Sequence, residues 1–407
     1  MACRAAQPPS LSRWAGWRTS SAFIGRDVTG IRQTRSMTMD ASGASISAVR
    51  AARLAAQGLD DGFDSPASAV ERLVCLQAQD LAAAKWVLGA RVAGTTEATI
   101  DTAIDERELL RSWPMRGTLH FVAPEMLRPI LSLTAARLMQ RAAKTHRDEG
   151  IDDEVHAVAR RVAVHELEGG RAATRDELQA AWTAAGIDTT GQRGYHLIWR
   201  LANEGLLCCG PVETRARQRF VLLDEWSPRR SDEPEDADEI LGRLFAAYAR
   251  GHGPVTVRDF AWWTGLTLTL ARVAQAAAGD AVIPFDAERF VAADAPSAPT
   301  AGAPVEPTGR HVLASFDEYF LGYGDRTAFC SDVDALRVVP GKNGLFLPIL
   351  VADGEVVGTW RRAPERRGTT SIEVKRFRGR PAVSGFRPAF TRWAAFWSTE
   401  LGEITTG

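Results

Sequence analysis

Two glutamines flank a single alanine in the stretch VCLQAQD, residues 74–80, directly after an apolar run. A glutamine side chain offers an amide oxygen and an amide NH2 group, and neither is a strong base. Chemistry carried by Gln77 and Gln79 must therefore need little proton transfer. Orienting a water molecule, or facing developing positive charge with a dipole, would meet that condition. The alternative is a pair of turn amides that bond to nearby backbone groups.

The neighbouring residues predict that this pair lies in the turn between two helices. Ser65 followed by Pro66 is typical of a helix start, and apolar side chains then recur at helical spacing as far as Gln77. Asp80 is the expected N-cap of a further helix at residues 81–92. On one continuous helix, residues two positions apart point about 200° away from each other. A turn instead lets both amides face one point.

A β-hairpin is predicted directly downstream of these helices. Two short extended runs, residues 109–113 and 118–122, flank the turn sequence PMRG at 114–117. A hairpin after two or three helices is typical of a winged helix, so residues 40–125 are expected to form a first unit of that type. Side chains on such a wing either contact DNA or are satisfied within the fold. Its candidate DNA-binding or supporting residues are Trp113, Arg116 and His120.

The order of helices followed by paired strands recurs twice more. Residues 126–232 form the clearest copy, and residues 233–292 form a third. The expected recognition helix of the second copy, residues 192–204, holds the candidate DNA-binding residues Arg193 and Arg200. Helices and strands are expected at 126–147, 152–167, 175–182, 192–204, 206–209 and 219–223 in the second copy, and at 240–250, 257–263, 267–278, 282–285 and 290–292 in the third.

The sequence changes character after the third copy. Residues 293–310 are rich in Ala and Pro and are interpreted as a linker. Strand-like runs with turn signals then predict a small β-barrel or curled sheet over 311–407, with a final helix at about 388–401. The predicted fold class is mainly α with β (α+β): tandem winged-helix domains and a C-terminal β-barrel. The expected strands are 312–316, 345–351, 355–360 and 370–374.

Residues 1–39 differ in composition from the rest of the chain. They carry six arginines against one acidic residue, Asp27. A basic presequence and an over-extended start, with the true initiator at Met37 or Met39, both fit this pattern, and the Ala- and Arg-rich body favours the second. The segment is excluded from the predicted fold.

Bulk composition excludes several classes of protein. The chain has 407 residues, enough for two to four domains, and a net charge of −1, so any nucleic-acid surface must be local. Its five cysteines form no CxxC pair, which argues against a disulfide framework or a cysteine zinc site. The seven histidines show no metal-ligand spacing. No apolar run reaches membrane-spanning length. We expect a bacterial cytoplasmic, nucleoid-associated protein without metal or cofactor.

Basic side chains are concentrated in two places. Residues 360–380 hold eight basic residues against two acidic ones, and such a stripe can neutralise phosphates. For any single arginine a solvated surface is the alternative. A second cluster, Arg137, Arg141, Lys144 and Arg147, lies near one helix end. The candidate DNA-binding residues in the first stripe are Arg361, Arg362, Lys375 and Arg376.

The stretch FDEYFLGYGDR, residues 316–326, combines carboxylates with aromatic side chains. Such carboxylates can be catalytic or bind a metal, but loop-fixing hydrogen bonds and ion pairs are the favoured interpretation. Asp325 next to Arg326 is expected to form an internal pair. Asp317, Asp325 and Arg326 are therefore kept as supporting residues.

Five segments together resemble the winged-helix DNA-binding family that contains the bacterial AlkZ and YcaQ DNA glycosylases. The resemblance covers about residues 40–400 and implies three winged helices and a β-barrel arranged as a C-shaped clamp on DNA. The segments are RLVCLQAQD (72–80), RSWPMRGTLHFV (111–122), AWWTGL (261–266), FDEYFLGYGDR (316–326) and PGKNGLFLPILVADGEVVGTWRR (340–362).

The resemblance implies an activity. The family's catalytic element is Gln-apolar-Gln or Gln-apolar-Asp, and Gln77-Ala78-Gln79 matches the AlkZ-like version. The implied reaction cleaves the N-glycosidic bond of alkylated purines in double-stranded DNA, including N7-alkylguanine, bulky adducts and interstrand crosslinks. An alkylated purine already carries positive charge and leaves as a neutral base, so amides suffice where a strong general acid is absent. The implied state is a monomer without cofactor.

Two other functions fit the same sequence. A non-catalytic transcriptional regulator would use the helix at 192–204 to read bases, although such regulators usually dimerise and no dimerisation heptad is visible. An inactive scaffold would keep the family fold without the reaction.

Overall fold

The computed structural model describes residues 45–230, 236–295, 307–341, 344–364, 366, 368–377 and 382–407. The basic segment 1–39 and most of the Ala- and Pro-rich linker lie outside the described residues. No helix in the described ranges is long and apolar enough to cross a membrane. Cys75, Cys208, Cys209 and Cys330 are buried and form no disulfide with one another.

The N-terminal part contains the glutamine pair on a strand. The predicted helix after Ser65 forms, with a Ser65–Ser68 capping box, but it ends at Leu73 because Val74 takes a positive φ of 64°. The prediction that the pair lies in a helix–helix turn is therefore wrong at Gln77, which lies in a strand. The elements are α1 (Ile46–Ala56), α2 (Pro66–Leu73), β1 (Cys75–Gln77), α3 (Leu81–Gly89, capped by Asp80 as expected) and α4 (Glu97–Asp105).

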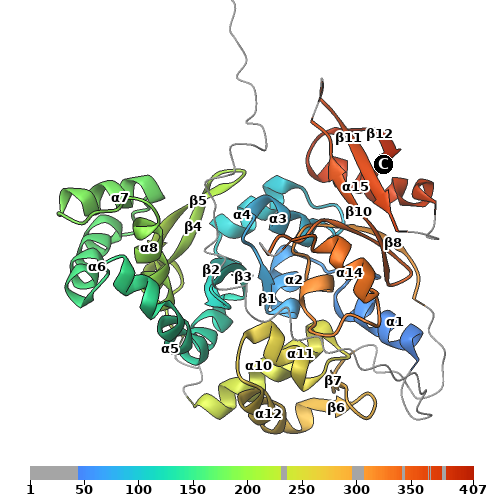
Figure 1. The fold of residues 1–407 in the computed structure, drawn as a ribbon, viewed down its shortest axis with the longest axis horizontal. Helices are drawn as coiled ribbons and strands as arrows, with labels where there is room; N and C mark the ends of the chain where they lie inside the picture. Colours follow the sequence, from blue (N-terminus) through green and yellow to red (C-terminus); the bar gives the residue numbers. More distant parts are fainter. Residues whose placement is uncertain are drawn as a thin grey trace, which may run out of the picture.

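The predicted hairpin is present and forms the middle of a larger sheet. Strands β2 (Leu110–Met115) and β3 (Thr118–Val122) are joined at Arg116 and Gly117, whose φ angles of 56° and 75° are those of a primed hairpin turn. The strand order is β1-β3-β2-β4-β5, where β4 is Leu207–Thr214 and β5 is Arg217–Leu222. Hairpins that the sequence assigns to two units thus share one five-stranded sheet (Figure 1).

Helices flank this sheet and enclose a second, smaller hydrophobic core. Trp182 and Leu197 are fully buried there, and Trp113 reaches this core from β2. The flanking helices form the green part of Figure 1. They are α5 (Pro124–Asp148), α6 (Asp153–Leu167), α7 (Arg175–Ala184) and α8 (Arg193–Asn203), whereas the short α9 (Leu223–Trp226) packs on the first core.

The helices and strands predicted between residues 240 and 292 form to within a few residues of their predicted bounds. Thr256 caps its helix through a capping box with Asp259, and Gly265 ends that helix in the left-handed region at φ 73°. The elements are α10 (Ala237–His252), α11 (Val257–Thr264), α12 (Leu268–Ala277), η2 (Gly279–Ala281), β6 (Val282–Pro284) and β7 (Phe290–Ala292).

The C-terminal part is a half-barrel. Its strand order is β12-β11-β10-β9-β8, and within the described residues no bond joins the two edge strands. The predicted final helix to residue 401 is wrong over its last five residues, because α15 ends at Phe396 and the chain then adds β12 parallel to β11. The elements are β8 (Arg310–Leu313), α13 (Glu318–Leu321), α14 (Asp332–Val338), β9 (Ile349–Ala352), β10 (Glu355–Arg362), β11 (Thr369–Arg376), η3 (Val383–Phe386), α15 (Arg387–Phe396) and β12 (Glu400–Thr406).

Candidate functional site

The two glutamines lie at one edge of the five-stranded sheet and face the β2–β3 hairpin. Gln77 is opposite His120 in the β1–β3 register and is 7% exposed, whereas Gln79 is half-buried. Pairing continues one residue beyond β1, because the Ala78 N–H donates to the Leu119 carbonyl at 2.7 Å. An extended backbone therefore holds the pair.

The two amides have different partners. The Gln79 Oε1 accepts a hydrogen bond from the Leu119 N–H at 3.1 Å. This bond is of the kind expected if the amide only fixes nearby backbone, but the amide oxygen keeps a second lone pair for another partner. Among the described residues, the Gln77 Oε1 accepts only a long 3.5 Å contact from the Arg116 Nη2. Gln77 is thus the amide whose oxygen is less committed to the fold.

His120 is held as a neutral imidazole. Its Nδ1 lies 2.8 Å from the Thr118 carbonyl, which can only accept, so Nδ1 carries the proton. Its Nε2 then has a lone pair for the Arg116 Nη2, 3.0 Å away. Burial, with the Arg116 charge beside it, lowers the pKa of His120 from 6.5 to about 3. At neutral pH His120 therefore positions Arg116 and has no proton to give from Nε2.

A buried carboxylate lies behind the strand. Glu318 is fully buried, and its Oε1 accepts a hydrogen bond from the Gln77 backbone N–H at 3.1 Å. Its Oε2 accepts from the Trp263 Nε1 at 3.1 Å and lies 3.3 Å from the His252 Nε2. Burial acts to raise the pKa of Glu318, but the His252 hydrogen bond and the charges of His252 and Arg116 outweigh it, so the net shift is downward.

Sequence reasoning did not assign this anchoring role to Glu318. In the sequence, Glu318 is one of several carboxylates in the 316–326 stretch, and its partners Gln77, His252 and Trp263 come from three distant segments. A usable signal was the position of Glu318 beside Tyr319 and Phe320 in an apolar run, because a carboxylate inside such a run must find buried donors.

The other polar residues of the 316–326 stretch bond within the fold, although the buried Nη2 of Arg326 has no hydrogen-bond partner among the described residues. Both oxygens of Asp317 accept from the Arg91 guanidinium, at 2.8 and 2.9 Å, and both side chains are fully buried. The expected Asp325–Arg326 pair is wrong. Asp325 instead accepts from Thr327, while Arg326 donates to the Phe320 carbonyl and its guanidinium lies over the Phe320 ring. Among the described residues, no group of three or more His, Cys, Asp or Glu could hold a metal ion.

The expected recognition helix, α8, shows little polar surface. Eight of its eleven residues are buried. Arg200 contacts Asp153 and Glu204, and Arg193 donates to the Gly150 carbonyl. Trp113 lies in the second core and donates from its Nε1 to the Tyr195 hydroxyl at 3.3 Å. No hydrogen bond or ion pair among the described residues joins these three predicted residues to the glutamine pair, and α8 offers few side chains for reading bases.

The C-terminal basic residues lie on the β10–β11 hairpin, and all four are exposed. The register pairs Arg361 with Glu373 and Arg362 with Ile372, so neighbouring arginines point to opposite faces. Lys375 shares the face of Arg361, which also bonds to Glu373, and Arg376 shares the face of Arg362. The four charges therefore form two pairs rather than one continuous stripe.

Three comparisons with known proteins agree with this architecture. A model of the family described as "DNA glycosylase AlkZ-like" matches residues 70–396. A Streptomyces sahachiroi protein named interstrand DNA cross-link repair glycosylase is 28% identical over 308 residues, which are 73% of this chain and 82% of the relative. The solved structure of Streptomyces sahachiroi DNA glycosylase AlkZ superposes with a TM-score of 0.74 at 25% identity, covering 89% of this chain and 100% of the other.

Proposed function

From its membership of the AlkZ-like DNA glycosylase family, which identifies the chain as a hydrolase of N-glycosyl bonds, we propose that it releases cationic alkylated purines from duplex DNA. N7-alkylguanine is the simplest such substrate. The Streptomyces sahachiroi relative is named for interstrand cross-link repair, and we extend the proposal to bulky N7 adducts and crosslinks on that basis.

One observation supports the choice of a positively charged purine as the substrate. Among the described residues, the only side chain that donates a hydrogen bond to either glutamine side chain is Arg116, and Arg116 bonds to a histidine held neutral. Neither glutamine therefore has a partner that could protonate a leaving purine at neutral pH. A normal guanine leaves badly without such help, whereas an N7-alkylguanine carries its positive charge already.

The proposed reaction needs no general acid. The C1′–N9 bond breaks, its electron pair neutralises the charged purine, and positive charge develops at the sugar. A water molecule then bonds to C1′ and loses its proton to solvent. The Gln77 amide oxygen orients that water and faces the developing charge, and the Gln79 amide assists from the second lone pair of its oxygen.

The remaining units are proposed to hold the DNA. We interpret the three sets of helices with their hairpins as winged helices that act with the half-barrel as a monomeric clamp on the duplex. Arg116 and the β10–β11 basic residues are the proposed phosphate contacts. The burial of α8 supports a clamp that follows DNA shape rather than a regulator that reads a base sequence.

The test is release of N7-methylguanine from alkylated duplex DNA. We expect release by the wild type, none by Gln77→Ala/Gln79→Ala, and unchanged release by Gln140→Ala, which removes an exposed glutamine from α5. DNA binding by the double variant should match that of the wild type. If the wild type releases neither this base nor a crosslinked one, the proposal is wrong.

A further inference from the structure

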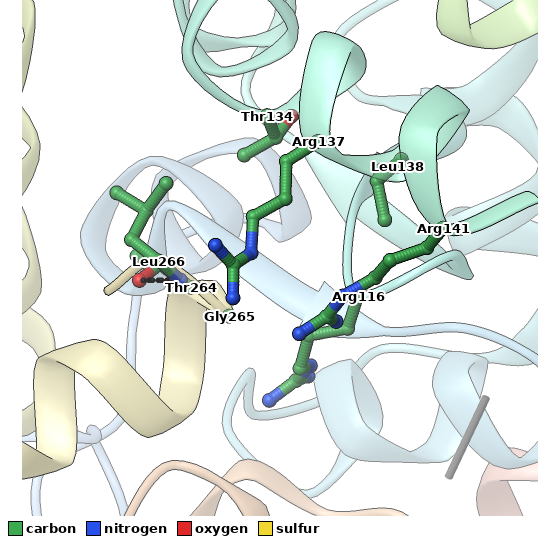
Figure 2. A pocket seen from close by; sticks show the side chains of 8 residues that line it. All are labelled: Arg116, Thr134, Arg137, Leu138, Arg141, Thr264, Gly265 and Leu266. Carbon is green, nitrogen blue, oxygen red and sulfur yellow. Dashed lines mark hydrogen bonds between the residues drawn. The ribbon is translucent and has the colours of Figure 1, made fainter. Parts of the chain in front are cut away.

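Three arginines converge on one pocket beside the glutamine pair. Arg116 reaches it from the β2–β3 turn, and Arg137 and Arg141 reach it from α5, with their guanidinium groups directed toward a common space (Figure 2). Residues at the end of α11 and one more turn of α5 complete the wall, and no carboxylate lines it. The lining residues are Arg116, Thr134, Arg137, Leu138, Arg141, Thr264, Gly265 and Leu266.

The described residues compensate the positive charge of this pocket only in part, and Arg137 has no carboxylate partner among them. The buried Nε of Arg137 has no hydrogen-bond partner among the described residues. Arg116 makes its side-chain hydrogen bonds to neutral groups, the His120 ring and the Gln77 amide, and the buried Glu318 carboxylate acts on its charge without a hydrogen bond. Two other buried arginines are neutralised, Arg91 by Asp317 and Arg128 by Asp224, whereas the buried Arg111 is held by the Ala78 carbonyl and the Gln218 amide. The C-terminal end of α11, with its partial negative charge, compensates only part of the pocket's charge.

We propose that this pocket binds one phosphodiester of the DNA backbone next to the lesion nucleotide. The proposal rests on the proposed function for the identity of the anion. A phosphate accepts several hydrogen bonds at once, and the planar guanidinium fork matches that geometry. Because Arg116 also touches Gln77, the bound phosphate fixes the register between the DNA backbone and the reacting amide.

Binding of the phosphate also changes what Gln77 can do. The Arg116 Nη2–Gln77 Oε1 contact is 3.5 Å long, at the limit of a hydrogen bond. A phosphate that draws the Arg116 guanidinium toward itself weakens this contact and leaves the amide oxygen for the water and the sugar. It also neutralises a positive charge that would oppose positive charge developing at the sugar. The pocket is therefore a positioning subsite that acts through Arg116.

The test is a scan with neutral linkages. Duplexes with one N7-methylguanine carry a single methylphosphonate at successive positions around the lesion, and base release is measured in single turnover. For the wild type, we expect one or two adjacent positions to slow release at least tenfold. In Arg137→Gln the neutral linkage should no longer slow base release, because the phosphate contact that the linkage removes is already missing from this variant. Arg161→Gln, an exposed arginine on α6, is the matched control and should keep the wild-type profile.

A second measurement is independent of base release. The salt dependence of binding to undamaged duplex should lose about 0.9 of its logarithmic slope in Arg137→Gln and nothing in Arg161→Gln. Arg137→Lys, which keeps the charge, should restore most of the slope, and an unchanged melting temperature in each variant shows that the fold is intact.

The outcomes separate the two proposals. If Arg137→Gln behaves like Arg161→Gln in both measurements, the phosphate subsite is wrong, while base release by the wild type still supports the glycosylase proposal. If the slope falls in Arg137→Gln but the wild type releases no base, the subsite stands and the proposed substrate is wrong.

Discussion

The Glu318 carboxylate and the Gln77 backbone N–H are 3.1 Å apart, although 241 positions separate the two residues in the chain. Glu318 begins α13, which follows the first strand of the half-barrel, whereas Gln77 ends β1. The C-terminal part of the chain therefore holds the strand that presents the proposed catalytic amides. The bond is to the backbone, so it fixes where the strand lies without occupying the amide side chain.

Glu318→Gln should impair base release without impairing DNA binding. The substitution keeps the shape but removes the charge that accepts from Gln77, Trp263 and His252, and unpaired buried donors cost about 1–3 kcal/mol each. Urea unfolding measures the loss of stability, and single-turnover kinetics measure the loss of base release. Glu154→Gln, an exposed residue of α6, is the control. Wild-type release by Glu318→Gln would contradict the anchoring role.

The same carboxylate makes stability depend on pH. Because the folded pKa of Glu318 is below the usual 4.5, its contribution is fully present above 4.5 and is lost as pH falls below it. The free energy of unfolding of the wild type should therefore fall more steeply below pH 4.5 than that of Glu318→Gln. Parallel curves for the two proteins would show that Glu318 is not stabilised as a charged group.

Titration of His120 should not affect the pH dependence of the base-release rate. Its folded pKa of about 3 lies far below 6.5, so it stays neutral through the physiological range. The unfolded state binds a proton below pH 6.5 that the folded state does not, so stability falls from 6.5 toward 3 as the pH is lowered. Release rates measured from pH 6 to 8 should show no inflection near 6.5. An inflection there that His120→Gln removes would mean that His120 titrates during the reaction.

The two glutamines should separate in their effect on stability. Gln79→Ala removes the acceptor of the Leu119 N–H and should cost about 1 kcal/mol, whereas Gln77→Ala breaks only the long Arg116 contact and should cost less. Both should slow release by about 100-fold or more, as removal of a preorganised polar group does. Thermal unfolding and release by each single variant test this. Equal stability losses would contradict the unequal roles of the two amide oxygens.

Asp317 should prove structural. Asp317→Asn leaves the buried Arg91 guanidinium without its charge partner, and breaking such a pair costs about 3–5 kcal/mol. Release per folded molecule should stay near the wild-type rate at a temperature where the variant is folded. If Asp317→Asn loses base release while its stability is unchanged, Asp317 acts in the reaction and not only in the fold.

Local signals in the sequence predicted local structure. Ser65, Asp80, Thr174 and Thr256 cap helices as expected, since each cap depends on residues three positions away. The hairpin turn at Arg116 and Gly117 is equally local. The family resemblance placed the chain among the AlkZ-like glycosylases, and the comparisons confirm that placement.

Contacts between residues far apart in the chain could not be predicted from the sequence. Strand β1 has three residues, too few to show a period, and its partner β3 is more than forty positions away. The anchoring of Gln77 by Glu318 and the burial of α8 depend on elements that meet only in the folded chain. β12 was missed for the same reason, because it forms only where β11 offers a free edge.

The shared five-stranded sheet limits how this protein can be divided or recombined. A cut between residues 125 and 126 would leave the strands β1 to β3 on one piece and β4 and β5 on the other, and Arg111, which bonds to both the Ala78 carbonyl and the Gln218 side chain, would lose one of its partners. The two regions therefore cannot be exchanged between relatives as independent modules. An insertion that shifts β4 by one position would break its pairing with β2 unless β2 shifts as well. We therefore expect residues 45–125 and 126–230 to change together during evolution.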